Sequence, residues 1–242
     1  MRCCIVIPAR MGSTRFPGKP LCDLLGKPMI QWVVEAAIKA EVADRIVVAT
    51  PDQEIVSACR EFGTEALLTS INHPTGTDRI AEISQSVVAD VYVNVQGDEP
   101  LIDPETIAIC ANPLLTDSSI PMGSIFSPCP DEERDNPAVV KVVTDLDGFA
   151  LYFSRHAIPF PRNTSIATYK KHVGIYAYRR EVVQSFAKWD QSPLEVTESL
   201  EQLRFMEHGV RIKMSQGKGS ALAVDTPEQA EEVRRILQAQ QG

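Results

Sequence analysis

The chain has 242 residues and a hydrophobic content of 44%, enough for a sizeable core, which excludes an intrinsically disordered protein. Its 24 basic and 32 acidic residues give a net charge of −8, which excludes a broad cationic surface for binding nucleic acid. No apolar run approaches the length of about 18 residues that marks a membrane span, and a strand-like stretch follows Met1 directly, so we expect a cytosolic protein.

The first hundred residues alternate apolar strands with amphipathic helices. Runs rich in β-branched residues predict four buried strands, at 3–9, 44–50, 64–70 and 90–96. Helical periodicity predicts three helices between them, at 28–40, 52–63 and 77–88. We therefore expect an α/β fold, a Rossmann-like three-layer sandwich with a mostly parallel sheet that binds ligands at the carboxyl ends of its strands.

The pattern changes after a helix predicted at 103–115, which has Asp103 as its cap and Pro104 as its first residue. Two alternating strands joined at Asp147 and Gly148 predict a β-hairpin within 139–155. We interpret 137–172 as a lobe inserted into a single domain that spans 1–242, with an apolar surface suited to an interface. The remaining patterns predict strands and helices at 170–178, 180–189, 193–209, 210–216 and 226–240.

The segment IPARMGSTRFPGKP, directly after the first strand, carries a local positive charge. It contains Arg10, Arg15 and Lys19, and no Asp or Glu occurs before Asp23. Its glycines and Ser13 allow close backbone approach, so its amides can cradle phosphate groups. We expect this segment to bind a phosphate chain; the alternative is a solvated loop.

This segment is not a P-loop, although it comes close to one. Five residues separate Gly12 from Gly18, where the signature has four, and Pro20 stands where a Ser or Thr would bind magnesium. Hydrolysis of a nucleoside triphosphate by a Walker-type site is therefore not expected.

Two further segments place carboxylates after apolar runs. In NVQGDEP, Asp98 is a candidate Mg²⁺ ligand, with Glu99 as the second candidate carboxylate; the alternative is a simple turn at Gly97 and Asp98. In LAVDTPEQA, either Asp225 or Thr226 caps a helix. The spacing does not show whether Asp225 lies beside Asp98.

Seven motifs together resemble one enzyme family. PARMGSTRFPGKPL, HPTGTDR, NVQGDEPLI, ALYFSRHAIP, HVGIYAY, LEQLR and VDTPEQ are similar to the motifs of CMP-Kdo synthetases (3-deoxy-manno-octulosonate cytidylyltransferases). The resemblance implies a sandwich of the nucleotide-diphospho-sugar transferase type and a homodimer. It also implies Mg²⁺-dependent transfer of a cytidylyl group from CTP to the anomeric hydroxyl of 3-deoxy-manno-octulosonate (Kdo), with release of pyrophosphate, in bacterial lipopolysaccharide biosynthesis.

The resemblance also assigns roles to individual residues. CTP would be bound by Arg10, Ser13, Arg15, Lys19, Thr75, Gly76, Arg79 and Gln96. Kdo would be bound by Arg155, His172, Tyr176, Glu201 and Gln202. Asp98 and Asp225 would hold Mg²⁺, and together with Arg15 and Lys19 they would form the catalytic set.

The residues implied to bind the sugar also have simpler interpretations. Tyr176 is also explained as a strand aromatic, His172 as a satisfied polar residue and Glu201 as part of a solvated helix face. The stretch between Pro161 and His172 borders the implied sugar site, so an 8-amino analogue of Kdo is an alternative substrate. Two further functions are alternatives: cytidylyl transfer to sialic acid or another sugar acid, which we do not expect to keep HVGIYAY with LEQLR, and a catalytically silent regulator that binds a nucleotide, against which Lys19, Asp98 and Asp225 together argue.

Overall fold

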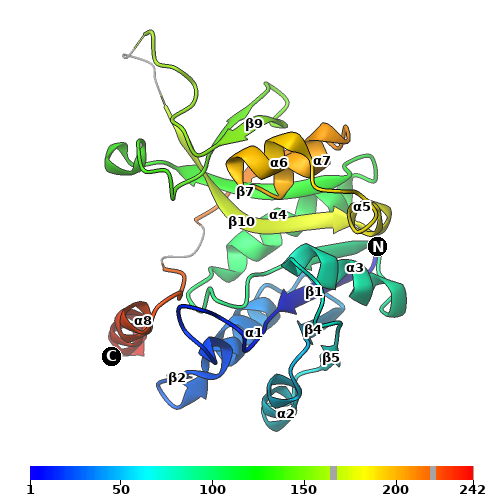
Figure 1. Ribbon diagram of the computed structural model, residues 1–242, viewed down its shortest axis with the longest axis vertical. Helices are drawn as coiled ribbons and strands as arrows, with labels where there is room; N and C mark the ends of the chain where they lie inside the picture. The colour runs from blue at the N-terminus through cyan, green and yellow to red at the C-terminus, as the bar shows by residue number, and fades with distance from the viewer. Residues whose placement is uncertain (164–167, 219–221, 242) are drawn as a thin grey trace.

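The computed structural model describes residues 1–163, 168–218 and 222–241, and its centre is a mixed β-sheet (Figure 1). The main path through the sheet runs, in this order, through β11 (Ile212–Gln216), β7 (Met122–Pro128), β10 (Lys170–Arg179), β6 (Val91–Asn94), β1 (Cys3–Pro8), β4 (Arg45–Thr50) and β5 (Ala66–Leu68). The first half of the chain supplies four mutually parallel strands: β1 (Cys3–Pro8), β4 (Arg45–Thr50), β5 (Ala66–Leu68) and β6 (Val91–Asn94). These are the four strands that the sequence predicts.

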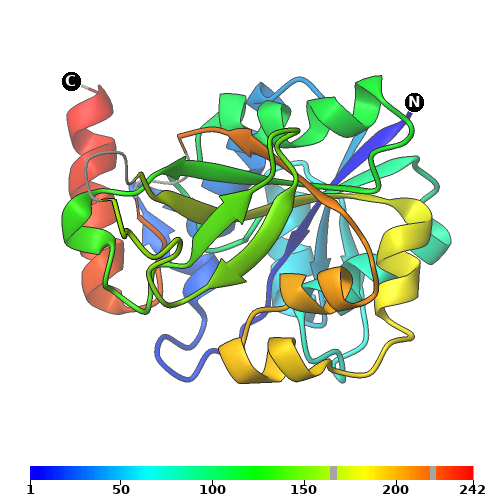
Figure 2. The ribbon, with the colours of Figure 1, turned by 90° about the horizontal axis from the view of Figure 1, so that it is seen from above.

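Helices cover both faces of the sheet (Figure 2), which confirms the three-layer sandwich. Alternate residues of β1 enter different cores, because Ile5 packs with one buried cluster and Val6 with the other. The first face is covered by α1 (Met29–Lys39), α2 (Gln53–Glu61) and α4 (Pro104–Thr116). The second face is covered by α3 (Gly76–Ser86), α5 (Arg180–Phe186) and α7 (Gln202–Glu207).

The second half of the chain extends the sheet with strands of mixed direction. β10 (Lys170–Arg179) is antiparallel to both β6 and β7 (Met122–Pro128), and β11 (Ile212–Gln216) is parallel to β7. The sequence predicts no strand at β7, because Gly123 and Ser124 dilute the β-branched pattern there. The register of β10 against β7 shifts between Val173 and Tyr176, so the strand carries a bulge at this point.

The predicted hairpin is present and joins the same sheet through β10. β8 (Lys141–Thr144) pairs with β9 (Ala150–Ser154), and the turn between them places Gly148 at a φ of 78°. Phe153 turns into the core, whereas Leu146 and Leu151 face outward. Residues 164–167 of the predicted lobe lie outside the described residues.

A buried lysine ties together the base of this lobe. Lys141 is fully buried, and its ammonium donates to the carbonyl oxygens of Asn136, Val139 and Arg155. These three carbonyls belong to segments on both sides of the hairpin, so one side chain holds the start and the end of the hairpin together.

The single helix predicted over 193–209 is wrong. Two short helices, α6 (Pro193–Glu198) and α7, are separated by Ser199, which adopts a left-handed conformation with a φ of 53°. The reason is a competition for carbonyls, because the Arg155 guanidinium donates to the carbonyl oxygens of Glu198 at 2.7 Å and Ser199 at 3.2 Å. An uninterrupted helix would need those oxygens for its own hydrogen bonds.

Small elements complete the chain. They are η1 (Lys19–Leu21), the short pair β2 (Asp23–Leu24) and β3 (Lys27–Pro28), η2 (Asp131–Glu133) and the closing helix α8 (Pro227–Gln241). Asp103 caps α4 as predicted, since its side chain accepts from Thr106 N. Within the described ranges, no helix is both long enough and apolar enough to cross a membrane.

A buried ion pair that joins α6 to α7 should contribute strongly to stability. Arg204 donates to both carboxylate oxygens of Glu195, at 2.6 and 2.5 Å, and the two side chains are only 5% and 4% exposed. Glu195→Ala would leave Arg204 charged and unpaired, so the free energy of unfolding should fall by about 3–5 kcal/mol in urea titrations. Glu65→Ala, which breaks the exposed Arg45 pair, should cost at most about 1 kcal/mol; equal losses in the two variants would contradict the prediction.

Candidate active site

A cavity of about 380 Å³ opens at the carboxyl edge of the parallel strands. Its walls come from the loop after β1, the start of α3, the loop after β6 and a residue just before α8. All the residues that were assigned to CTP or to metal line it: Arg10, Ser13, Arg15, Lys19, Thr75, Gly76, Arg79, Gln96, Asp98 and Asp225. The cavity therefore joins parts of the chain as distant as Lys19 and Asp225, which are 206 positions apart.

Lys19 lies at the centre of this cavity's polar contacts. It is the first residue of η1, and Gly18 before it takes a φ of 74°, a turn that glycine makes without strain. The Lys19 ammonium donates to Asp98 Oδ2 at 2.7 Å, to Asp225 Oδ1 at 3.0 Å and to the Val224 carbonyl oxygen at 3.0 Å. Burial alone would lower the pKa of Lys19, but the two carboxylates outweigh it and raise this pKa.

The structure answers the question that spacing left open, because Asp98 and Asp225 lie together. The same ammonium contacts one carboxylate oxygen of each, and Val224 N donates to Asp98 O at 2.8 Å. Arg15 contacts the second oxygen of Asp225 at 2.9 Å. Two loops from distant parts of the sequence are thereby held against each other by backbone as well as by charge.

Asp225 reaches this position because it does not cap α8. Thr226 Oγ1 accepts from Gln229 N at 3.4 Å, which makes Thr226 the cap. In return, Gln229 Oε1 accepts from Thr226 N at 3.0 Å and from Asp225 N at 2.7 Å. The reciprocal pair satisfies the helix start and leaves the Asp225 carboxylate facing Lys19.

The acceptor set around Lys19 fits a small hard cation. Two carboxylates and one carbonyl oxygen surround a single positive charge, and Mg²⁺ accepts few protein ligands when phosphates and water supply the rest. Within the described ranges, no three His, Cys, Asp or Glu residues are grouped to hold a metal ion by themselves. Glu99 does not line the cavity, and burial together with Asp98 raises its pKa to about 7.

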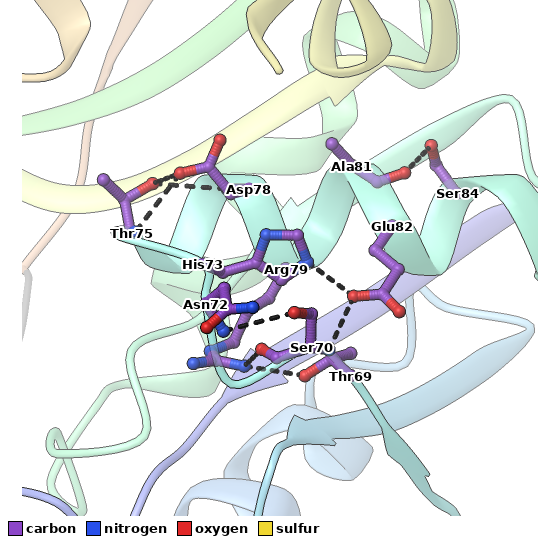
Figure 3. A network of polar contacts seen from close by, with 10 residues as sticks. All are labelled: Thr69, Ser70, Asn72, His73, Thr75, Asp78, Arg79, Ala81, Glu82 and Ser84. Atoms are coloured by element: carbon purple, nitrogen blue, oxygen red, sulfur yellow. Dashed lines mark hydrogen bonds and ion pairs between the residues drawn. The ribbon is translucent and has the colours of Figure 1, made fainter.

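Thr75 and Arg79, at the start of α3, line the cavity, and Figure 3 shows the polar contacts that hold them. Thr75 caps the helix through Asp78, and Arg79 donates to Thr69 Oγ1 and to the Ser70 carbonyl, both at 2.8 Å. Burial and the nearby Arg10 lower the pKa of Arg79, so two cations repel each other along this wall. An anion between them would relieve that repulsion.

His73, which has no role among the predicted site residues, also lines this cavity. Its Nε2 lies 2.5 Å from Glu82 Oε2, and Glu82 also accepts from Ser70 N at 2.9 Å (Figure 3). The signal for this residue was its place in the HPTGTDR motif. Its ring is held by Glu82 and borders the cavity.

A second cavity, of about 250 Å³, adjoins the first, because Gly76 and Gln96 line both. Tyr176, Glu201 and Gln202, which were assigned to the sugar, are among its lining residues. The Tyr176 hydroxyl lies 3.2 Å from Gln202 Oε1. Gln96 Nε2 donates to the Gly174 carbonyl at 3.3 Å, at the bulge of β10.

Two polar groups in this second cavity are poised for a ligand. Gln202 is 3% exposed, and its Nε2 has no partner among the described residues, so it is free to donate to a ligand or a water molecule in the cavity. Glu201 accepts from Thr77 Oγ1 at 2.8 Å, and burial raises its pKa. Glu201 therefore faces a cavity and is not part of a solvated helix face.

The remaining two residues assigned to the sugar, Arg155 and His172, do not line either cavity. The Arg155 guanidinium donates to three carbonyl oxygens, those of Pro137, Glu198 and Ser199. The His172 ring packs against Tyr176 with a centroid distance of 5.4 Å, and burial lowers the pKa of His172 to about 3. Both contact residues of the cavity wall, and direct contact with a sugar stays a prediction.

Comparison with known proteins gives one consistent result. The family model described as "Cytidylyltransferase" matches residues 4–212. The chain is 44% identical to 3-deoxy-manno-octulosonate cytidylyltransferase of Escherichia coli, over 96% of this chain and 95% of the relative. It is 49% identical to the enzyme of the same name from Pseudomonas fluorescens, over 97% and 98% of the respective chains.

Solved structures agree with these sequence relatives. CMP:2-keto-3-deoxy-manno-octonic acid synthetase complexed with CTP superposes with a TM-score of 0.97 at 43% identity, covering 99% of this chain and 100% of that one. A cytidylyltransferase from Leptospira borgpetersenii has a TM-score of 0.66 at 16% identity and covers 99% and 87% of the two chains, which shows a shared fold only.

The reciprocal contact of Gln229 with the start of α8 yields a prediction for stability. Gln229→Ala removes the acceptor for the backbone N–H groups of Asp225 and Thr226, so the free energy of unfolding should fall by about 1 kcal/mol. Gln229→Glu keeps an acceptor at a helix N-terminus and should retain wild-type stability. Urea titration of both variants measures the difference, and an unchanged midpoint for Gln229→Ala would show that the contact is unimportant.

Proposed function

Since the chain belongs to the cytidylyltransferase family, we propose that it transfers the cytidylyl group of CTP to the anomeric hydroxyl of Kdo and releases pyrophosphate. The observation that carries this proposal is the pair of adjoining cavities with Gly76 and Gln96 in their common wall. One cavity has the charges for a triphosphate, and the other has the polar groups for a sugar. The names of its relatives supply the same two substrates.

The first cavity suits the triphosphate of CTP. Arg10, Arg15, Lys19 and Arg79 bring four cations to a protein whose net charge is −8. Such a local concentration of positive charge attracts a polyanion and fixes its register through charge-assisted hydrogen bonds. Gly97 allows the loop after β6 to lie against the end of β1, since a Cβ there would stand 2.7 Å from the Pro8 carbonyl oxygen.

The second cavity suits an acidic polyol. Gln202 offers an unpaired amide donor, Glu201 a carboxyl acceptor and Tyr176 a hydroxyl, and each can hydrogen bond to sugar hydroxyls. Arg155 fixes the carbonyls at the break between α6 and α7, and so holds Glu201 and Gln202 in place. A sugar bound there presents its anomeric hydroxyl toward the first cavity across the shared wall.

The chemistry that follows is an in-line displacement at the α-phosphorus. The sugar hydroxyl forms the new oxygen–phosphorus bond as the bond to pyrophosphate breaks, so no covalent intermediate with the protein is needed. Lys19 and Arg15 stabilise the charge on the phosphoryl oxygens during the displacement. Asp98 and Asp225 would hold Mg²⁺, which supplies further neutralisation of phosphate charge when bound.

The test is a pyrophosphate-release assay with CTP and a panel of sugar acids that includes Kdo, 8-amino Kdo and sialic acid. We expect release with Kdo and CTP, and little with ATP, GTP or UTP in place of CTP. Release only with 8-amino Kdo or sialic acid would replace the proposed substrate. CTP binding without release for any sugar would support a silent regulator and overturn the proposal.

The proposed metal site predicts a non-additive loss of activity. EDTA should abolish turnover and Mg²⁺ should restore it, because the metal neutralises phosphate charge. Asp98→Asn and Asp225→Asn should each lower kcat on the order of a hundredfold or more, and the double variant should be little worse than either, since the pair acts as a unit. Asp131→Asn, on the exposed η2, is the control. Full activity of Asp225→Asn would remove Asp225 from the site.

We also propose a homodimer formed through the lobe at 139–162. Its outward side chains include Phe160 at 86% exposure and Leu151 at 59%, more apolar surface than a protruding lobe should leave in water. Phe160→Asp should shift the protein from dimer to monomer in analytical ultracentrifugation. Ile71→Asp changes another apolar residue, 77% exposed but outside the lobe, and should leave the mass unchanged. A wild-type protein that sediments as a monomer at every concentration would refute the proposal.

We place this reaction in the cytoplasm, where its product would supply activated Kdo for lipopolysaccharide biosynthesis. The support is the state of the thiols, because all six cysteines are free and four of them, Cys3, Cys4, Cys59 and Cys110, are buried. Free, buried thiols are typical of proteins kept in a reducing compartment.

A further inference from the structure

The three N–H groups of the Lys19 ammonium all have partners within the protein. A lysine ammonium has three N–H donors and no acceptor. The partners are Asp98 Oδ2 at 2.7 Å, Asp225 Oδ1 at 3.0 Å and the Val224 carbonyl oxygen at 3.0 Å. The side chain is 14% exposed, so water does not replace these contacts freely. Lys19 therefore binds a phosphate oxygen only after it releases at least one of these partners.

The partners that Lys19 holds are the same groups that would hold the metal ion. A Mg²⁺ ion needs its oxygen ligands at about 2.1 Å, and the ammonium stands among those oxygens. Two cations in one position would also repel each other strongly in this half-buried site. The ammonium and the metal ion are thus alternative occupants of the space between Asp98 and Asp225.

We propose that the Lys19 ammonium occupies the position of the metal ion in the nucleotide-free enzyme, so that the metal ion binds only together with the nucleotide. This inference rests on the proposed function, because it takes CTP as the group that draws Lys19 away. The triphosphate offers Lys19 new anionic acceptors and brings its own bound metal ion. The exchange moves the singly charged ammonium from the carboxylates to the phosphates, and a doubly charged metal ion takes its place between the carboxylates.

This exchange sets the order in which nucleotide and metal ion bind, and it lowers the affinity of the nucleotide-free enzyme for free divalent cations. Free divalent cations bind the enzyme weakly before the nucleotide arrives, since they must first displace a saturated lysine. Metal and nucleotide instead strengthen each other's binding, which is a coupling between two ligands. Arg15, whose side chain is 65% exposed, contacts only one oxygen of Asp225 and does not fill the position between the carboxylates.

The direct test measures Mn²⁺ binding without nucleotide, by the electron paramagnetic resonance signal of free Mn²⁺. Lys19→Met removes the ammonium and keeps most of the side chain's length. We expect this variant to bind Mn²⁺ roughly tenfold more tightly than wild type, or more. Lys188→Met makes the same change of net charge at an exposed site and should bind as wild type does. Equal affinity in wild type and Lys19→Met would overturn the inference.

A second measurement on the wild-type protein covers the case in which Lys19→Met does not fold. The ligand is a non-hydrolysable CTP analogue with a methylene between its α- and β-phosphorus atoms. Mn²⁺ should bind the complex of protein and analogue roughly tenfold or more tightly than it binds the analogue alone in solution. Unchanged binding would again overturn the inference. Pyrophosphate release by the wild-type protein is measured separately. If the enzyme is active but binds Mn²⁺ tightly in the absence of nucleotide, the exchange is refuted and the proposed function stands.

Discussion

The contact of the Lys19 ammonium with two carboxylates is the interaction on which the first cavity depends. It joins the loop after β1 to Asp98, 79 positions away, and to Asp225, 206 positions away. Two carboxylates this close would repel each other, and a cation between them turns that repulsion into attraction. The loop after β1, the loop after β6 and the segment before α8 are therefore held together by charge at the point where the reaction is proposed to occur.

The sheet itself explains why two substrates can be brought together. β6 and β10 run side by side in opposite directions, so the end of β6 leads into Gln96 and Asp98 while the bulged middle of β10 presents Gly174 and Tyr176. Gln96 bridges the two through its hydrogen bond to the Gly174 carbonyl. The two residues that line both cavities, Gly76 and Gln96, lie at the start of α3 and just after β6, so the cavities adjoin where these two elements reach the edge of the sheet.

Local patterns predicted most of the elements, because short-range physics decides them. Asp103 before Pro104 marks the start of α4, and the β-branched runs of β1, β4 and β6 are buried on both faces. The prediction was wrong where a distant side chain decides the outcome, since Arg155 takes the carbonyls that would have continued α6.

The sequence predicted the cationic segment of the first cavity from its charge pattern, but it did not predict the residues of the second cavity in this way. The charge pattern indicated the phosphate cavity, whereas the sugar residues were identified only by resemblance. Spacing could not show that Asp225 and Asp98 contact the same ammonium, because the position of Asp225 depends on Gln229, which satisfies the helix start and leaves the Asp225 carboxylate to face Lys19.

The break at Ser199 places four consecutive residues of the link between α6 and α7 in one cavity only. One wall of the second cavity comes from Ser199 to Gln202, and none of these residues lines the first cavity. Substitutions from Ser199 to Gln202 can therefore change which sugar is bound, while the loops that line the first cavity keep their sequence. The choice of nucleotide and the choice of sugar can therefore change independently. Exchanging the link from Ser199 to Gln202 between homologous chains would change the sugar cavity and leave the residues of the first cavity unaltered.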